Sequence, residues 1–164
     1  MIYFLPIEDI EQRYSVMMNQ AIRPYVDKEL YPKMPYPSVI EKGEFLDINK
    51  TCIFKSKQLQ MVSELFYRNK IKHGDIFLIG DIFFPGIEMI RYMAELQKIK
   101  VYIFGWSYAG RADSNDFVRK LGYWADSSES GYYRICDMVF VGSQWHKNAI
   151  MNYYDVDNIV VTGL

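Results

Sequence analysis

The sequence predicts an α/β fold in which a doubly wound, mostly parallel sheet is flanked by helices, and three observations support this prediction. The run IFLI at Ile76–Ile79 is apolar at every position, as in a strand buried on both faces of a parallel sheet. Short β-prone runs alternate with segments of helical spacing along the chain. Gly74–Phe104 has the order and length of one strand–helix–strand unit. We therefore expect a Rossmann-like domain.

The first elements are expected to be a strand, a helix and a loop. Ile2–Leu5 is short and β-prone. Glu8–Asp27 carries apolar residues at helical spacing as far as Pro24, where a proline would end or kink a helix. Leu30–Ser38 contains three prolines and is therefore expected to be a loop.

The middle of the chain continues the alternation. Phe45–Phe54 contains two short β-prone pieces, and Ser56–Asn69 has helical periodicity. After the buried strand at Ile76–Ile79, the segment Gly86–Lys98 is again helical in spacing. Lys100–Phe104 alternates β-branched and aromatic residues, which predicts the next strand.

The last third is expected to end on two more strands. Two short helices are predicted at Asp116–Trp124 and Ser127–Ile135, followed by a strand at Asp137–Val141. Ser143 is placed to cap a helix that runs through Tyr154, because its hydroxyl can accept from the first free backbone N–H groups. A final strand is predicted at Ile159–Thr162.

Composition and charge restrict the functional classes. Half of the residues are hydrophobic and 24% are charged, as in an ordinary globular protein. The formal net charge of −1 gives no support to nucleic acid as a partner, although it leaves nucleic acid open as an acceptor. No apolar run has the length of a membrane span. Cys52 and Cys136 lack metal-ligand spacing, so we expect free thiols in the cytoplasm and no zinc site.

Residues 1–164 have the length of one domain, enough to bury a core without disulfides or a metal. The chain stops at Leu164 directly after a predicted strand, so we expect a linker and a second domain to follow. The motifs GxGxxG, GxxxxGK[ST] and GxSxG do not occur in the sequence. Dinucleotide-dependent redox enzymes, P-loop proteins and α/β-hydrolases therefore lose their usual support.

Ligands of open α/β sheets bind beyond the carboxyl ends of the strands, so the loops there are the candidate sites. The loop after Ile79 offers Asp81 as a candidate catalytic carboxylate, with Phe84 and Gly86 as candidate binding residues. The alternative is that Asp81 only caps the next helix and that the aromatic residues pack inward.

The loop after Phe104 is the strongest candidate, because it combines rings for stacking, a cation and two carboxylates. Asp113 is its candidate catalytic residue. Its candidate binding residues are Trp106, Tyr108, Gly110, Arg111 and Asp116. The alternative is a capping loop in which Asp113 or Asp116 caps the next helix and Arg111 pairs with one of these two carboxylates at the surface.

The loop after Val141 places Ser143 at a helix N-terminus, where free N–H groups can bind an anion or a sugar hydroxyl, although plain capping explains Ser143 as well. His73 and His146 have no Ser, Cys or carboxylate partner visible in the sequence. Neither histidine is therefore expected to be catalytic.

Several of these segments together resemble a known family. They are GDIFLIGDIFFPGIEMIRYM, KVYIFGWSYAGRADSNDF, the pair Trp124 and Glu129, CDMVFVGSQWHKNAIM and IVVTGL. This set resembles the N-terminal domain of glycosyltransferases with the two-domain GT-B fold, over roughly Lys55–Leu164. The resemblance implies that the chain binds the acceptor, whereas a C-terminal domain binds the nucleotide-sugar donor, so no cofactor is expected in this chain.

By the same analogy, the cleft between the two domains would be lined by Asp81, Tyr108, Gly110, Asp113, Asp116 and Ser143. Related sequences often have His before Ala-Gly, where this chain has Tyr108, a phenol with an ordinary pKa near 10 and a poor base. An inverting transfer would then need Asp113 or Asp81 to take the acceptor's proton, and a retaining transfer would need no such base.

Two other functions stay open. The first is a standalone Rossmann-like module that binds a nucleotide or a sugar without turnover. The second is a small-molecule enzyme of flavodoxin-like architecture with Asp81 and Asp113 in its site.

Overall fold

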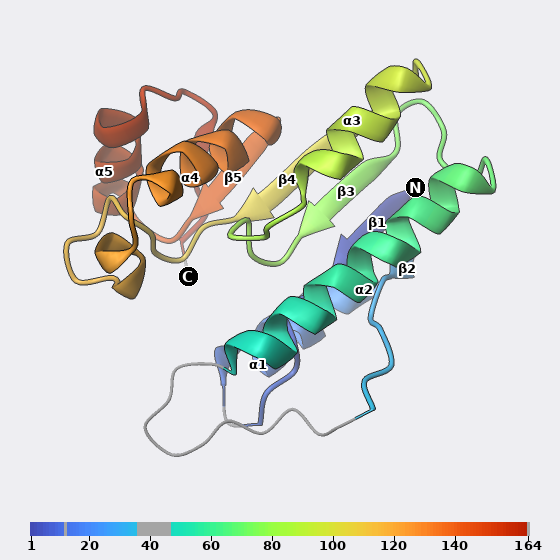
Figure 1. The fold of residues 1–164 in the computed structure, drawn as a ribbon, viewed down its shortest axis with the longest axis horizontal. Helices are drawn as coiled ribbons and strands as arrows, with labels where there is room; N and C mark the ends of the chain where they lie inside the picture. Colours follow the sequence, from blue (N-terminus) through green and yellow to red (C-terminus); the bar gives the residue numbers. More distant parts are fainter. Residues whose placement is uncertain (12, 36–46, 164) are drawn as a thin grey trace.

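The structure is a computed structural model of the chain and describes residues 1–11, 13–35 and 47–163. Its six strands are β1 (Ile2–Leu5), β2 (Lys28–Glu29), β3 (Ile76–Ile79), β4 (Tyr102–Trp106), β5 (Met138–Val141) and β6 (Ile159–Val161). They form one sheet in the order β2-β1-β3-β4-β5-β6, and every neighbouring pair is parallel (Figure 1). The predicted parallel α/β sheet is confirmed.

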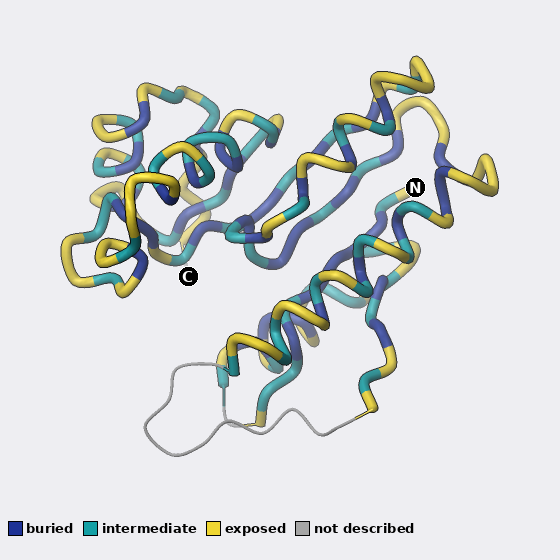
Figure 2. Tube along the Cα trace, in the orientation of Figure 1, coloured by how far each residue is buried: buried dark blue, intermediate teal, exposed yellow. Residues whose placement is uncertain are grey.

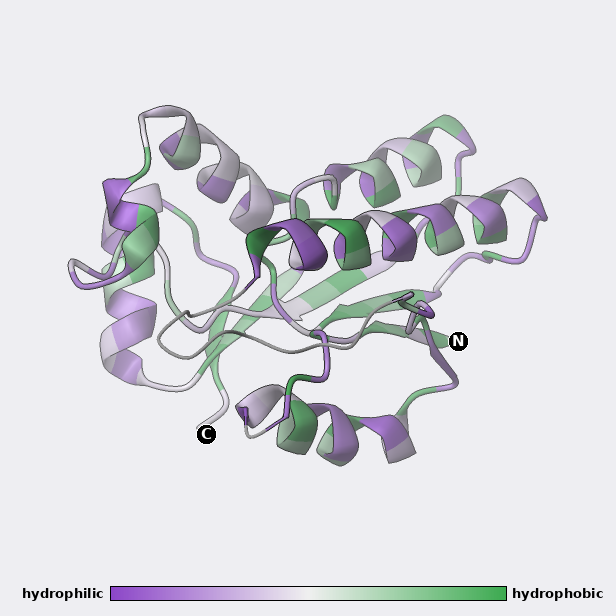
Figure 3. Ribbon diagram, turned by 60° about the horizontal axis from the view of Figure 1, so that its bottom comes forward, coloured by the Kyte–Doolittle hydropathy of each residue, from purple (hydrophilic) through white to green (hydrophobic). Residues whose placement is uncertain are grey.

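The helical elements are α1 (Tyr14–Ile22), η1 (Arg23–Tyr25), α2 (Ile48–Tyr67), α3 (Glu88–Leu96), η2 (Phe117–Lys120), α4 (Trp124–Ile135) and α5 (Gln144–Tyr154). From β1 the chain crosses to β2 at one edge of the sheet. The next four crossovers, from β2 to β3 and on to β6, all run in the opposite direction. Because crossovers share one hand, α1 lies on one side of the sheet and α2 to α5 on the other (Figure 3). This is doubly wound topology, with the strand order of flavodoxin-like sheets and one further strand.

The main core lies between the sheet and α2 to α5. Side chains alternate along each strand, so Phe77, Ile103 and Val139 are fully buried against these helices. Each helix contributes an apolar stripe, and Figure 2 shows that its outer side is exposed.

The opposite face of the sheet is unevenly covered. Phe4 on β1 is fully buried, whereas Leu78, Phe104 and Phe140 on the later strands are half-buried and lie outside the main core cluster. The parallel register places Leu78 beside Phe104 and Trp106 beside Phe140, and the diagonally placed rings of Phe104 and Phe140 have centroids 6.3 Å apart. The described chain thus leaves an aromatic sheet face partly open to water.

Three predicted elements differ from the structure. The helix expected over Glu8–Asp27 begins only at Tyr14 and ends in η1, and the strand β2 that follows was not predicted. Ile48–Phe54 belongs to α2, so the strand expected in this part of Phe45–Phe54 is wrong, and residues 45 and 46 lie outside the described residues. Asp47 caps α2 by accepting from the backbone N–H of Lys50 at 3.1 Å, and Phe54 and Gln58 continue the buried stripe of the helix. The helix expected at Asp116–Trp124 is only the short η2, capped by Asp116.

Candidate functional site

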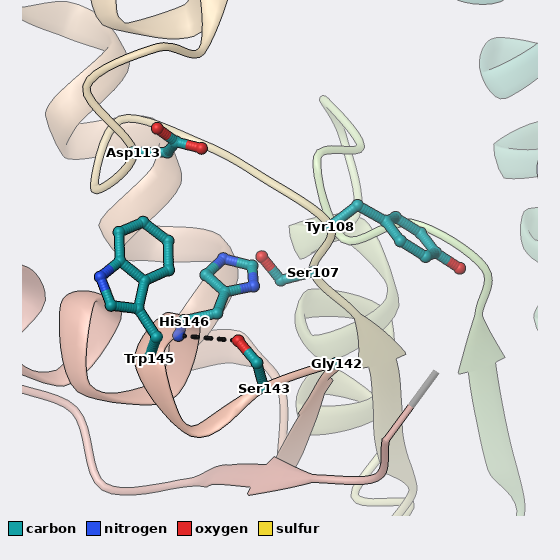
Figure 4. A pocket seen from close by; sticks show the side chains of 7 residues that line it. All are labelled: Ser107, Tyr108, Asp113, Gly142, Ser143, Trp145 and His146. Carbon is teal, nitrogen blue, oxygen red and sulfur yellow. Dashed lines mark hydrogen bonds between the residues drawn. The ribbon is translucent and has the colours of Figure 1, made fainter.

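A pocket of about 270 Å³ lies at the carboxyl edge of the sheet, between the loop after β4 and the start of α5. Its volume is near the lower end for ligand pockets, which span roughly 300–1,000 Å³. Seven residues line it: Ser107, Tyr108, Asp113, Gly142, Ser143, Trp145 and His146 (Figure 4). The pocket therefore brings together candidates from two of the three loops.

The β5 side of the pocket is built by a capped helix. The Ser143 hydroxyl accepts from the backbone N–H of His146 at 3.1 Å, as predicted for an N-cap. This cap fixes the first turn of α5, so that Trp145 and His146 both face the pocket. The indole of Trp145 is 64% exposed and is available for stacking.

His146 is the chemically most notable residue in the pocket. Its side chain is buried, and burial lowers the pKa of the imidazole below its usual 6.5. The negative charge of Asp113 acts in the opposite direction and favours the imidazolium. The group is therefore a neutral imidazole at pH 7 that can accept a proton while a carboxylate stabilises the resulting charge.

The loop after β4 contributes the opposite wall. Asp113 lies there in Figure 4, and its carboxylate accepts from the backbone N–H of Asn115 at 2.8 Å. Ser107 lines the pocket beside His146, and its hydroxyl lies 2.9 Å from that of Tyr133. A carboxylate and a hydroxyl therefore line the same pocket.

Tyr108 lines the pocket edge, but Figure 4 shows its ring pointing away from His146. The ring packs against Tyr14 of α1, with centroids 5.0 Å apart, and the phenol donates to the sulfur of Met18. Burial raises the pKa of Tyr108 well above its ordinary value. Tyr108 is therefore a wall of the pocket and has no capacity to act as a base.

Arg111 and Asp116 stabilise the loop and do not line the pocket. The guanidinium of Arg111 is buried, with Nε donating to Asp126 at 2.6 Å and Nη1 donating to the carbonyl of Leu121 at 2.8 Å. Asp116 accepts from the N–H of Val118 at 2.7 Å and so caps η2. Asp116 therefore caps a helix, as in the structural alternative, whereas Arg111 is buried and pairs with Asp126 rather than with a carboxylate of its own loop.

Three other candidates also lie outside the pocket. Phe84 is buried in the core, and Gly86 adopts φ +94° with its α-carbon facing Leu59. Trp106 is on the opposite face of the sheet, where its ring packs on Phe140 with centroids 5.1 Å apart. The aromatic side chains of Phe84 and Trp106 suggested a binding role, but in the sequence they look the same as aromatic residues that line a pocket.

Asp81 does not line the pocket either. Its carboxylate accepts from the N–H of Phe83 at 3.0 Å and pairs with Lys55 at 3.6 Å. It borders a small cavity of about 10 Å³, also lined by Ser107 and Glu129, which is room for one water molecule. The two candidate carboxylates, Asp81 and Asp113, therefore lie in separate cavities that share Ser107.

Gly110 is required by its surroundings. Its φ is +136°, and a β-carbon there would lie 2.0 Å from a carboxylate oxygen of Glu129. Glu129 is only 2% exposed, and burial raises its pKa to about 7. The sequence offers no local sign of this role, because Glu129 lies in the middle of α4, far along the chain from the loop that it contacts.

In the described residues, no group of three or more His, Cys, Asp or Glu side chains could hold a metal ion. No helix in the described ranges is long and apolar enough to cross a membrane. A comparison of the chain with protein-family models finds no match, and a comparison with curated proteins finds none either.

Proposed function

We propose that the pocket between β4 and β5 binds a hydroxyl-bearing acceptor, and that the chain is the acceptor-side half of a glycosyltransferase with the GT-B fold. The observation that carries the proposal is that Asp113 and His146 line one pocket together with the exposed indole of Trp145. Indole faces stack on sugars and other rings, and carboxylates and hydroxyls orient ligand hydroxyl groups. This combination suits a monosaccharide-sized group.

In an inverting transfer, the neutral imidazole of His146 takes the proton of the acceptor hydroxyl. The freed electron pair on that oxygen forms the bond to the anomeric carbon of a nucleotide sugar. The bond from that carbon to the nucleotide breaks, and its electrons leave with the nucleotide. Asp113 stabilises the imidazolium that forms, as its favourable effect on the charged ring indicates.

This assignment answers the difficulty raised by Tyr108. Related sequences often have a histidine where this chain has a phenol, and burial makes that phenol an even weaker acid. His146 brings an imidazole to the same pocket from α5 instead. Asp113 then acts as the partner of the base rather than as the base itself.

The donor belongs to a second, nucleotide-binding domain in this proposal. The chain carries none of the phosphate-binding glycine motifs, which is consistent with a donor bound elsewhere. Cys52 and Cys136 are both unpaired thiols, which supports residence in the cytoplasm.

The test is sugar transfer by the protein expressed from its full reading frame, with nucleotide release from a panel of nucleotide sugars as the readout. His146→Gln is expected to lower the rate by about 10²- to 10⁴-fold, the usual contribution of a general base. His73→Gln is the matched control, because His73 is exposed and far from the pocket, and it should retain the wild-type rate. Equal rates for the two variants would rule out His146 as the base. Ligand binding with no transfer from any donor would instead identify a binding module.

A further inference from the structure

Glu129 is a buried carboxylate that no step of the proposed transfer uses. Both of its oxygens accept from the backbone N–H of Arg111, at 3.2 and 3.1 Å. The backbone of Gly110 lies directly against the same carboxylate, where a side chain would not fit. Residues 110 and 111 belong to the loop after β4, which also carries Ser107, Tyr108 and Asp113 of the pocket.

One face of α4 contacts this loop at three points. Asp126, Glu129 and Tyr133 are spaced three and four residues apart and therefore lie along one side of the helix. Asp126 pairs with the guanidinium of Arg111 at 2.6 Å, and Tyr133 bonds to the Ser107 hydroxyl at 2.9 Å. Glu129 lies between them, at the point where the loop backbone is closest to the helix.

We propose that Glu129 is a positioning residue, which in its protonated form stabilises the loop after β4 in the conformation that forms the pocket, and that its ionisation loosens the loop and weakens ligand binding. The part of this inference that concerns ligand binding rests on the proposed function. The part that concerns the loop does not.

The physical reason is burial. The loop covers the carboxyl group, and the backbone N–H of Arg111 replaces little of the water that an ionised carboxylate loses there. The conformation that buries Glu129 is therefore stabilised when Glu129 is protonated, whereas ionisation favours a conformation in which water reaches the carboxylate. The loop that responds has two pocket-lining residues upstream of Arg111 and one downstream of it.

The surroundings of Glu129 favour protonation near neutral pH. Burial is the largest cause of its raised pKa, the negative charge of Asp116 adds to it, and the Arg111 N–H opposes it. The titratable or charged groups that face it are Tyr132 and Tyr133 on α4, Tyr154 on α5, Arg111 and Asp116 in the loop, and Asp81 across the small cavity.

The experiment is a pH titration of the ¹⁵N-labelled chain from about pH 5 to about pH 9, following backbone amides by NMR. The Arg111 amide is expected to move with an inflection near pH 7, and the amides of Ser107 and Asp113 should follow the same curve. Glu129→Gln keeps an acceptor oxygen but no charge, so these inflections should disappear. Asp126→Asn is the matched control on the same helix face and should retain them.

His146 is a second titratable group in the pocket, so the titration is repeated with His146→Gln to remove its contribution. An Arg111 amide that does not inflect in wild type, or that inflects equally in Glu129→Gln, overturns the proposal. If the variant does not fold, the ¹³C shift of the Glu129 carboxyl in wild type gives the same test. If only the Arg111 amide signal shifts with pH, while the Ser107 and Asp113 amide signals do not, Glu129 does not shape the pocket.

Ligand binding is measured on the same samples with methyl glucoside as the probe. Wild type should bind the probe about fivefold more weakly at pH 8 than at pH 5.5, the factor expected for the loss of one hydrogen bond as the loop loosens. Glu129→Gln should bind it equally at both values. If the amides titrate as expected but no probe binds, the proposed function fails while the role of Glu129 in the loop stands.

Discussion

The Asp113 carboxylate and the imidazole of His146 line the same pocket, although they come from loops after different strands. Two opposite effects act on the protonation of His146, because burial disfavours the imidazolium and the charge of Asp113 favours it. Removing the carboxylate should therefore lower the pKa of His146 further. We predict that Asp113→Asn moves the titration of the His146 ring protons, followed by NMR, to lower pH. An unchanged titration curve would show that the two groups are not coupled.

The same pair predicts the pH dependence of transfer. Only the neutral imidazole accepts a proton, so the rate should fall as the pH decreases through the pKa of His146, which lies below 6.5. His146→Gln should abolish this limb of the profile, and His73→Gln should leave it in place. A limb that survives in His146→Gln would assign it to another group.

Gly110 and Gly131 form a matched pair for the contact between the loop and α4. Gly110→Ala would place a methyl group 2.0 Å from Glu129 at a strained φ, so we predict a loss of about 1–3 kcal/mol in the free energy of unfolding. Gly131 lies within α4 with open space at its β-carbon, and Gly131→Ala should stabilise by about 0.5–1 kcal/mol. Urea unfolding measures both, and equal effects would contradict the close contact at Gly110.

Glu129 also predicts how stability depends on pH. Its pKa of about 7 in the folded state lies above its ordinary 4.5, so the folded state binds more protons between these values. The free energy of unfolding of wild type should therefore fall, relative to Glu129→Gln, as the pH rises from about 4.5 to about 7, by about 3 kcal/mol in total. Parallel stability curves for the two proteins would show that Glu129 has no raised pKa.

The two faces of the sheet predict opposite sensitivity at adjacent residues. Ile103 is fully buried beneath the helices, and Ile103→Ala should cost about 2–5 kcal/mol in the free energy of unfolding. Phe104 is larger but lies half-buried on the open face, so Phe104→Ala should cost under about 2 kcal/mol. A larger cost at Phe104, measured by urea unfolding, would mean that this face is covered in solution.

The sequence predicted best those elements that are determined by local patterns. The continuous apolar run of β3 and the capping hydroxyl of Ser143 both appear in the structure as expected. The strand predicted within Phe45–Phe54 is wrong, because the β-branched residues from Ile48 onward lie in the first turns of α2. The buried stripe of that helix continues through Gln58 and Val62. Tertiary packing decided that segment, and local preference did not.

The site was only partly predictable, because its residues meet through the fold. Asp113 and Ser143 could be identified from their positions after strands, but His146 had no partner near it in the sequence. A signal was present, since a residue three positions after an N-cap lies in the first turn of a helix that starts at the binding edge. Glu129 was noted only as part of the family resemblance, and no local pattern indicated its contact with Arg111, which depends on the packing of α4.

The most direct test of the pocket is a titration of the ¹⁵N-labelled chain with monosaccharides, and separately with uridine and adenosine diphosphates. An acceptor-side domain should show saturable shifts at Ser107, Asp113, Trp145 and His146 with at least one monosaccharide, and these should be lost in Trp145→Ala. Tight binding of a nucleoside diphosphate, with no sugar shifting these amides, would contradict the account.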